Sequence, residues 1–140
     1  MKMRIVSTRE ERERLIEFLT TMEQDFLSIS RKEAASLKYA EVVIEYVFKT
    51  GHVENENRVS KLLEMIKEAG LSDIKGCHHL YYAVRYSPDH EIIMDELVGI
   101  SKGIQEIIGS ETFFDWHITV IPDDNLERDL ELFVVAAKLV

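Results

Sequence analysis

Glu56-Asn57-Arg58 opens a run of helical period, and Asp73-Ile74-Lys75-Gly76 leads out of that run into a strand. Near the C-terminus, two apolar stretches at residues 116–121 and 130–137 flank the acidic turn Pro122-Asp123-Asp124-Asn125. The first pair of motifs marks a helix followed by a strand, and the second marks two strands joined by turn residues. Together they predict an α/β domain that ends in an antiparallel pair of strands.

Composition restricts the class of protein. The 140 residues are 46% hydrophobic, which is enough apolar material for one core and predicts a single domain. The net charge of -9 argues against nucleic acid or an anionic membrane surface as a partner. Cys77 is the only cysteine, so an internal disulfide is excluded, and no apolar run approaches the ~18 residues of a membrane span. We therefore expect a soluble cytoplasmic protein.

Residues 1–40 predict an N-terminal helical segment. Thr8-Arg9-Glu10-Glu11 and Ser30-Arg31-Lys32-Glu33 are both capping boxes, in which a hydroxyl and a carboxylate satisfy backbone amides at the start of a helix. The first helix carries an apolar stripe of helical period, formed by Leu15, Phe18, Leu19, Met22 and Phe26. Its other face is charged, with Arg9, Glu10, Glu13, Arg14 and Glu17. We expect the stripe to pack on the rest of the domain and the charged face to meet water.

Residues 41–140 alternate between strand and helix signals. β-Branched and aromatic residues predict strands at 42–48 and 77–86, and helical periodicity predicts a helix at 54–69 that ends at Gly70. Ser87-Pro88-Asp89 predicts the start of a helix that ends at Gly109 and places Ile93, Leu97, Ile100, Ile104 and Ile107 on one stripe. Two further strands are expected at 113–121 and 130–139. The predicted order is β-α-β-α-β-β, preceded by N-terminal helices.

The connections predict a mixed four-stranded sheet. Right-handed crossovers between the first three strands place those strands in parallel and their two helices on one face. The last two strands are expected to form a hairpin, because Asp, Asn and Pro fill the loop between them. Gly99 and Gly103 lie four residues apart on one face of the last helix, where we expect close approach to the sheet. Leu63 in the helix after Arg58 and Val134 in the last strand are expected to be buried on the same helix–sheet interface.

The order and spacing of these motifs resemble the C-terminal domain of FtsZ, the bacterial tubulin-like division protein. Asn55-Glu56-Asn57-Arg58 is similar to the Gly-Glu-Asn-Arg helix start of that family, and Asp73-Ile74-Lys75-Gly76 takes the place of its Gly-Ala-Lys-Gly turn. The resemblance spans residues 42–138, and residues 9–25 are similar in position to the end of the helix that joins the two FtsZ domains. It implies an FtsZ C-terminal-like domain at residues 41–140.

The departures from this family concern its enzymatic parts. Six scattered glycines provide no phosphate-cradling loop. The family's catalytic loop carries acids at Asn-x-Asp-x-x-Asp spacing, whereas the matching stretch here has only Asp25 and Glu33, with Arg31 and Lys32 between them. We therefore expect no GTP binding, no enzymatic activity and no cofactor.

Other residues raise the question of a metal or acid–base site. Cys77-His78-His79, with His90 and His117, are residue types that bind zinc, but no Cys-x-x-Cys or His-Glu-x-x-His spacing is present. A structural or surface role is preferred for them. Asp123 and Asp124 are interpreted as turn residues rather than as a catalytic or metal-binding pair. No catalytic, cofactor-binding or metal-ligating residue is predicted.

Two functions from different classes remain. The first is a non-enzymatic binding or assembly module linked to bacterial cell division or filament regulation, whose protein partner is an FtsZ-like filament or a second copy of the chain. The alternative is a small-molecule-binding or enzymatic α/β domain that uses the strand around Tyr81 and His79. Tyr81, Tyr82 and Tyr86 would line its pocket, although alternating aromatic residues also occur in ordinary sheet packing.

Overall fold

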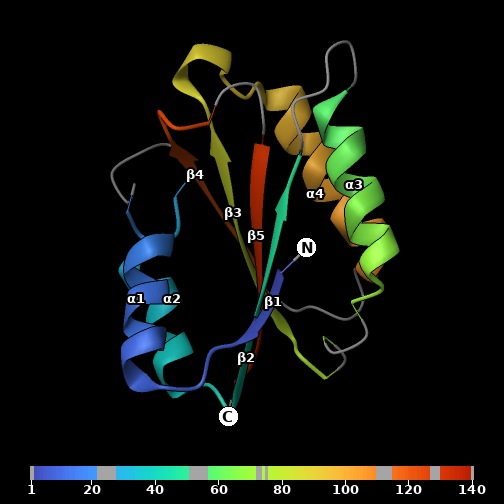
Figure 1. The fold of residues 1–140 in the computed structure, drawn as a ribbon. Helices are drawn as coiled ribbons and strands as arrows, with labels where there is room; N and C mark the ends of the chain where they lie inside the picture. Colours follow the sequence, from blue (N-terminus) through green and yellow to red (C-terminus); the bar gives the residue numbers. More distant parts are fainter. Residues whose placement is uncertain are drawn as a thin grey trace.

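A computed structural model places a mixed β-sheet between two layers of helices (Figure 1). It describes residues 2–21, 28–50, 57–71, 74, 76–109, 115–126 and 130–139. The described elements are, in chain order, β1 (Lys2–Ile5), α1 (Arg9–Leu19), α2 (Arg31–Ala34), the 3-10 turn η1 (Ala35–Tyr39), β2 (Val42–Lys49), α3 (Arg58–Ala69), β3 (His79–Tyr86), the 3-10 turn η3 (Pro88–His90), α4 (Met94–Ile108), β4 (Asp115–Pro122) and β5 (Leu130–Lys138).

The sheet has the strand order β1-β2-β5-β3-β4, so the prediction of four strands missed the short N-terminal strand β1. β5 is antiparallel to both β2 and β3, and β3 is parallel to β4. The predicted hairpin of β4 and β5 is wrong, because β3 lies between them. A central position suits β5, since its residues 134–137 are all fully buried and a strand covered on both faces is apolar on both faces.

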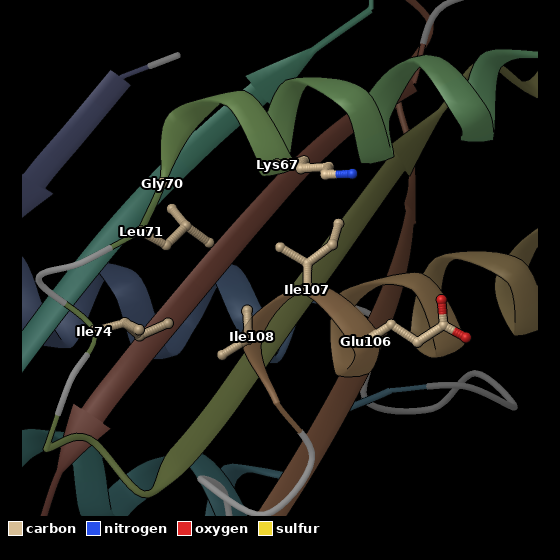
Figure 2. A pocket seen from close by; sticks show the side chains of 7 residues that line it. All are labelled: Lys67, Gly70, Leu71, Ile74, Glu106, Ile107 and Ile108. Atoms are coloured by element: carbon tan, nitrogen blue, oxygen red, sulfur yellow. The ribbon is translucent and has the colours of Figure 1, made fainter.

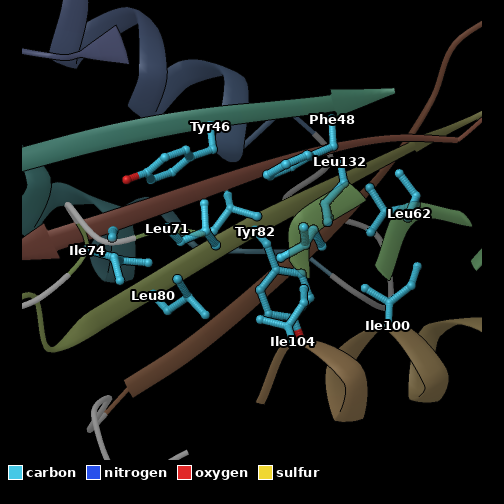
Figure 3. Close-up of a cluster of buried hydrophobic side chains, with 14 of the residues drawn as sticks. Tyr46, Phe48, Leu62, Leu71, Ile74, Leu80, Tyr82, Ile100, Ile104 and Leu132 are labelled. Atoms are coloured by element: carbon cyan, nitrogen blue, oxygen red, sulfur yellow. The ribbon is translucent and has the colours of Figure 1, made fainter. Parts of the chain in front are cut away.

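Each face of the sheet carries its own core. On one face α3 and α4 cover Tyr46, Phe48, Leu80, Tyr82 and Leu132, as Figure 3 shows; this is the α3/α4 core. On the other face α1 and α2 cover a second cluster, the α1/α2 core, which contains Val6, Leu15, Leu19, Ile29, Leu37, Val43, Tyr81, Val135 and Ala137. The prediction that α3 and α4 share one face is therefore confirmed.

The N-terminal helix packs as its sequence pattern predicts. In both capping boxes the hydroxyl accepts the expected backbone N–H, from Glu11 to Thr8 at 3.1 Å and from Glu33 to Ser30 at 3.1 Å. Leu15 and Leu19 are buried, and the Phe18 ring lies 4.7 Å from the ring of Phe133 on β5. The five charged residues of the opposite face are exposed. Met22 and Phe26, also assigned to the stripe, lie outside the described residues.

The start of α4 differs from the prediction. Ser87 caps only the short turn η3, through an N–H donated by Asp89 at 3.2 Å, and α4 begins seven residues after Ser87, at Met94. Ile93 therefore precedes the helix and is 58% exposed rather than part of its buried stripe. The remaining stripe is confirmed, since Leu97, Ile100 and Ile104 are buried and Ile107 packs against the same core.

Gly99 and Gly103 allow α4 to approach a helix, not the sheet as we expected. A Cβ at Gly99 would lie 3.4 Å from Val59 Cγ1, whereas a Cβ at Gly103 would lie 2.4 Å from both δ-carbons of Leu63. Both contacts are with α3, so the two glycines set the distance between the helices. Leu63, expected to be buried at the helix–sheet interface opposite Val134, is half-buried between the helices, whereas Val134 is fully buried.

The two glycines provide a matched pair of variants. We expect Gly99→Ala to be neutral or to stabilise by up to ~1 kcal/mol through helix propensity, because ordinary contact distance is kept. Gly103→Ala should destabilise relative to Gly99→Ala, because Leu63 must move. Leu63→Ala alone should cost about 1–2 kcal/mol, since the side chain is only half-buried. Urea unfolding of the wild type, the three single variants and the double variant Gly103→Ala/Leu63→Ala measures these costs. A Gly103→Ala cost that persists unchanged in the Leu63→Ala background would contradict this packing.

Candidate functional site

A polar pocket of about 460 Å³ lies on the α1/α2 side of the sheet. The parallel strands β3 and β4 pair Tyr81 with His117, so alternate residues bring Tyr81, His79 and His117 to the same face. The α2 segment supplies the facing wall. The lining residues are Ser30, Lys32, Glu33, Ser36, His79, Tyr81, His117 and Leu139.

The centre of this polar pocket is a stacked aromatic pair with a carboxylate beside it. The rings of Tyr81 and His117 lie 4.8 Å apart and are inclined by 18°. His117 Nδ1 lies 3.3 Å from Glu33 Oε2. The Tyr81 hydroxyl donates to the Glu33 carbonyl oxygen at 3.3 Å and lies 3.1 Å from Ser36 Oγ. The arrangement can bind a small polar molecule through hydroxyl and imidazole groups.

The sequence indicated part of this pocket. Tyr81 and His79, named for the alternative function, both line it, and His117 joins them. Glu33 and Ser36 were not predicted to line the pocket. Glu33 was assigned only to the capping box with Ser30. Tyr82 and Tyr86 do not belong to the pocket, since they pack on the α3/α4 core.

Cys77, His78 and His90 lie apart from the polar pocket that His79 and His117 line. Cys77 is buried in the α3/α4 core, and burial raises the pKa of its thiol. His78 and His90 are exposed, and neither lines the polar pocket. Across the described ranges, no group of three or more His, Cys, Asp or Glu side chains could hold a metal ion.

One of the two aspartates in the acidic turn after β4 has a structural role. Asp123 forms an ion pair with Arg85 on β3 and accepts the backbone N–H of Asn125 at 2.9 Å. Arg85 Nη1 also lies 2.9 Å from Glu131 Oε1 at the start of β5. Asp124 is exposed. Arg85 therefore ties the ends of three strands together.

The Asn57-Arg58 motif joins α3 to the segment before α4. Asn57 Oδ1 accepts the backbone N–H groups of Val59 and Ser60 at 3.0 and 3.2 Å, which caps α3. Arg58 binds Glu96 through two bonds, Nε–Oε2 at 2.7 Å and Nη2–Oε1 at 2.8 Å. It also donates to the carbonyl oxygens of His90 and Glu91, both at 3.1 Å. Hydrogen bonding from Arg58 lowers the pKa of Glu96.

An apolar pocket of about 510 Å³ opens between the C-terminal ends of α3 and α4 (Figure 2). Leu71, Ile74, Ile107 and Ile108 face the hollow, and the charged side chains of Lys67 and Glu106 lie at its side. Few polar groups converge here, so the apolar pocket is suited to hydrophobic contact rather than to catalysis.

Comparison with solved structures identifies the fold as one found in tubulin-like proteins. An FtsZ structure from M. jannaschii matches 91% of this chain with a TM-score of 0.60 and 16% identity. The GDP-bound monomer of CetZ1 from Haloferax volcanii matches 94% with a TM-score of 0.55 and 13% identity. A GTPγS-form protofilament of TubZ from Bacillus thuringiensis serovar israelensis matches 91% with a TM-score of 0.55 and 9% identity.

The resemblance found in the sequence is thus confirmed at the level of the fold. The chain covers 39% of each of these three proteins, which fits one part of a tubulin-like molecule. No family model and no curated protein matches the sequence. Within the described part of the chain, no helix has the length and apolar character needed to cross a membrane.

Proposed function

We propose that this chain is a non-enzymatic binding or assembly module of a tubulin-like filament system. The observation that carries the proposal is the match of more than nine-tenths of the chain to proteins whose solved forms include a protofilament. Other similar structures are an FtsZ dimer and a two-stranded TubZ filament. The proposed partner is therefore protein: an FtsZ-like filament or a second copy of the chain. A cytoplasmic role in bacterial cell division or filament regulation is part of this proposal.

The residues that carry the resemblance support a scaffold role over chemistry. Asn57 caps a helix and Arg58 connects two helices, while Gly76 has a positive φ of 93° in the turn before β3. These residues maintain a framework on which a binding surface can be presented. They hold no arrangement that activates a nucleophile or cradles a phosphate.

Co-sedimentation tests the proposal directly. Filaments of the tubulin-like GTPase from the same organism are assembled with a non-hydrolysable GTP analogue and pelleted with increasing amounts of this chain. We expect saturable recovery of the chain in the pellet, or a change in the amount of polymer. Two controls are needed. One is this chain after denaturation and removal of aggregates, and the other is an unrelated acidic protein of similar size. Absence of both effects, together with a strictly monomeric chain, would overturn the proposed function.

Nucleotide binding provides a separate prediction. We expect no GTP or GDP binding by this chain at micromolar concentrations, because its sequence offers no glycine-rich loop to surround a phosphate. Isothermal titration calorimetry with magnesium present measures this. A saturable, magnesium-dependent GTP site would refute the prediction and would favour an enzymatic role.

The polar pocket favours a second candidate function, the binding of a small polar molecule. Its support is the stacked Tyr81–His117 pair, with Glu33 and Ser36 in contact. Thermal-shift screening with a panel of polar metabolites tests it, using Tyr81→Phe to remove the hydroxyl and Tyr86→Phe on the opposite face as the matched control. A ligand whose stabilisation is lost only with Tyr81→Phe supports this function. If no compound shifts the melting temperature, or if the shift is the same in both variants, the small-molecule function is contradicted.

A further inference from the structure

A third pocket, which we call the basic pocket, lies where the start of α1 meets the 3-10 turn η1. Its volume is about 310 Å³, and it shares no lining residue with the polar or the apolar pocket. Ser7, Arg9 and Arg12 line it from the beginning of α1, and Lys38 and Tyr39 line it from η1. Three of these five side chains are cationic, although the chain as a whole carries a net charge of -9.

Arg12 is held in a fixed position in the basic pocket by backbone carbonyl oxygens. Its Nε donates to Val6 at 3.1 Å, and its Nη1 donates to Lys38 and Ala40 at 3.4 and 2.5 Å. Among the described residues, no carboxylate pairs with this half-buried guanidinium, and its Nη2 has no hydrogen-bond partner. Because the carbonyl oxygens orient the group without neutralising it, Arg12 has both charge and N–H donors left for an anion.

Arg9 and Lys38, the other two cations of the basic pocket, share one carboxylate. Glu13 Oε1 lies 3.1 Å from Arg9 Nε and 3.6 Å from Lys38 Nζ. Since Glu13 balances one of the three positive charges, two remain in excess. The Glu13 side chain is 49% exposed, and ion pairs of exposed side chains contribute little free energy, so a bound anion can compete with this carboxylate.

The other two acidic residues in the first turn of α1 have their partners outside the basic pocket. Glu11 Oε1 accepts the backbone N–H and the hydroxyl of Thr8 at 3.3 and 2.8 Å, and Glu11 Oε2 lies 3.8 Å from Arg4. Glu10 Oε2 lies 3.8 Å from Arg14. Neither carboxylate lines the basic pocket, so the positive charge inside it is not cancelled by its own helix.

We propose that the basic pocket binds the phosphate group of a small phosphate monoester. Such a group carries a charge of about -1.5 to -2 at neutral pH, which matches the excess of positive charge, whereas a carboxylate carries a single charge. Arg9, Arg12 and Lys38 supply N–H donors for the phosphate oxygens, and the Ser7 hydroxyl supplies an O–H donor. The volume is at the lower end of the roughly 300–1,000 Å³ of ligand pockets, so a small ester fits better than a nucleotide.

The Tyr39 side chain supplies an apolar wall for the organic part of the ligand. It is 74% exposed, and Lys38 Nζ lies 6.0 Å from the centre of its ring. The ring therefore stands beside a cation that holds the phosphate, where a carbon group attached to the phosphate can pack on it. This binding site goes beyond the proposed assembly function and does not depend on it.

An NMR titration of the ¹⁵N-labelled protein with phenyl phosphate tests the site, at an ionic strength kept constant with sodium chloride. We expect the amide signals of residues 7–12 and 38–40 to shift and to saturate at millimolar concentrations, because few contacts hold so small a ligand. Inorganic phosphate should shift the same signals but bind several-fold more weakly, since it makes no contact with the Tyr39 ring. Tyr39→Ala should remove this difference between the two ligands.

Two pairs of variants with equal changes in net charge separate the pocket from the general field of the protein. Lys38→Gln should weaken phenyl phosphate binding by about fivefold or more, whereas Arg14→Gln, outside the pocket, should change it by less than about twofold. Glu13→Gln should strengthen binding by about twofold or more, because the competing carboxylate is removed. Glu10→Gln, which removes the same charge outside the pocket, should have little effect.

The variants that test the charges are suited to this comparison because all four substituted side chains reach solvent, with exposed fractions from 29% to 84%. Circular dichroism should therefore show the wild-type fold in each of them. Signals that shift without saturating, or equal effects within either pair of variants, would overturn the phosphate site. Equal affinities for inorganic phosphate and phenyl phosphate in the wild type would overturn the assignment of a phosphate ester as its ligand.

Discussion

Removing residues 1–27 is expected to abolish cooperative unfolding and to cause aggregation. This segment supplies β1 and α1, and its side chains Val6, Leu15 and Leu19 are almost completely buried in the α1/α2 core. Each such side chain contributes about 1.5–3 kcal/mol when it is buried. The total is comparable with the ~5–15 kcal/mol that stabilises an entire small domain. Circular dichroism during urea unfolding, together with light scattering, measures the loss.

Single substitutions on opposite faces of α1 provide the control for this truncation. Leu19→Asp introduces a carboxylate into the α1/α2 core and should destabilise strongly, whereas Glu17→Ala on the exposed face should change little. A truncated protein that stays monomeric and unfolds cooperatively would contradict the prediction. α1 would then be a detachable arm, and its apolar stripe would be a docking surface.

Arg58→Met is expected to lower the free energy of unfolding by about 3 kcal/mol. The side chain of Arg58 is only 10% exposed and that of Glu96 only 21%, so the substitution leaves a poorly solvated carboxylate without its partner. The carbonyl oxygens of His90 and Glu91 lose a donor as well. Urea unfolding at neutral pH measures the cost. Arg58→Lys should be intermediate, because an ammonium group cannot reproduce the two-pronged bond to Glu96.

The pH dependence of this pair has a definite sign. The pKa of Glu96 is lowered in the folded protein, so the stabilisation is fully present above the unfolded-state pKa and is lost as pH falls through the folded pKa. The difference between wild type and Arg58→Met should therefore shrink on acidification below about pH 4. The double variant Arg58→Met/Glu96→Gln should be more stable than Arg58→Met alone. A difference that is constant from pH 7 to pH 3 would show that the ion pair is not its source.

Local signals in the sequence predicted most of the helices and strands. The capping boxes at Thr8 and Ser30 fix their helix starts through bonds within three residues, and Asn57 and Gly70 delimit α3 in the same way. α4 was the exception, because Ser87-Pro88 is a helix start by local rules yet supports only a 3-10 turn. There the contact of Arg58 with the His90 and Glu91 carbonyl oxygens, 32 and 33 residues away, holds the chain extended before the helix begins.

The arrangement of the strands depended on contacts that local rules do not contain. The Asp-rich composition of the loop after β4 is typical of a hairpin turn. In the structure, however, Asp123 donates its backbone N–H to the Tyr86 carbonyl oxygen and forms an ion pair with Arg85, and both residues belong to the neighbouring strand β3. Val134-Val135-Ala136-Ala137 was the available clue, because a run without polar alternation suits a central strand. The polar pocket was only partly predictable for the same reason, since Glu33 and His117 meet through the tertiary fold.

The central position of β5 has a consequence for the synthesis of the protein. Until residues 130–138 leave the ribosome, β2 and β3 have no strand between them, and the nascent chain holds two incomplete pieces of sheet. Both apolar faces of the future sheet then remain without their central strand, a condition in which unpaired edges favour aggregation. Folding is therefore expected to be slow for the size of this domain, because the pairings of β5 join residues between 44 and 96 positions apart. A binding partner of the nascent chain, such as a holding chaperone, would act in that interval.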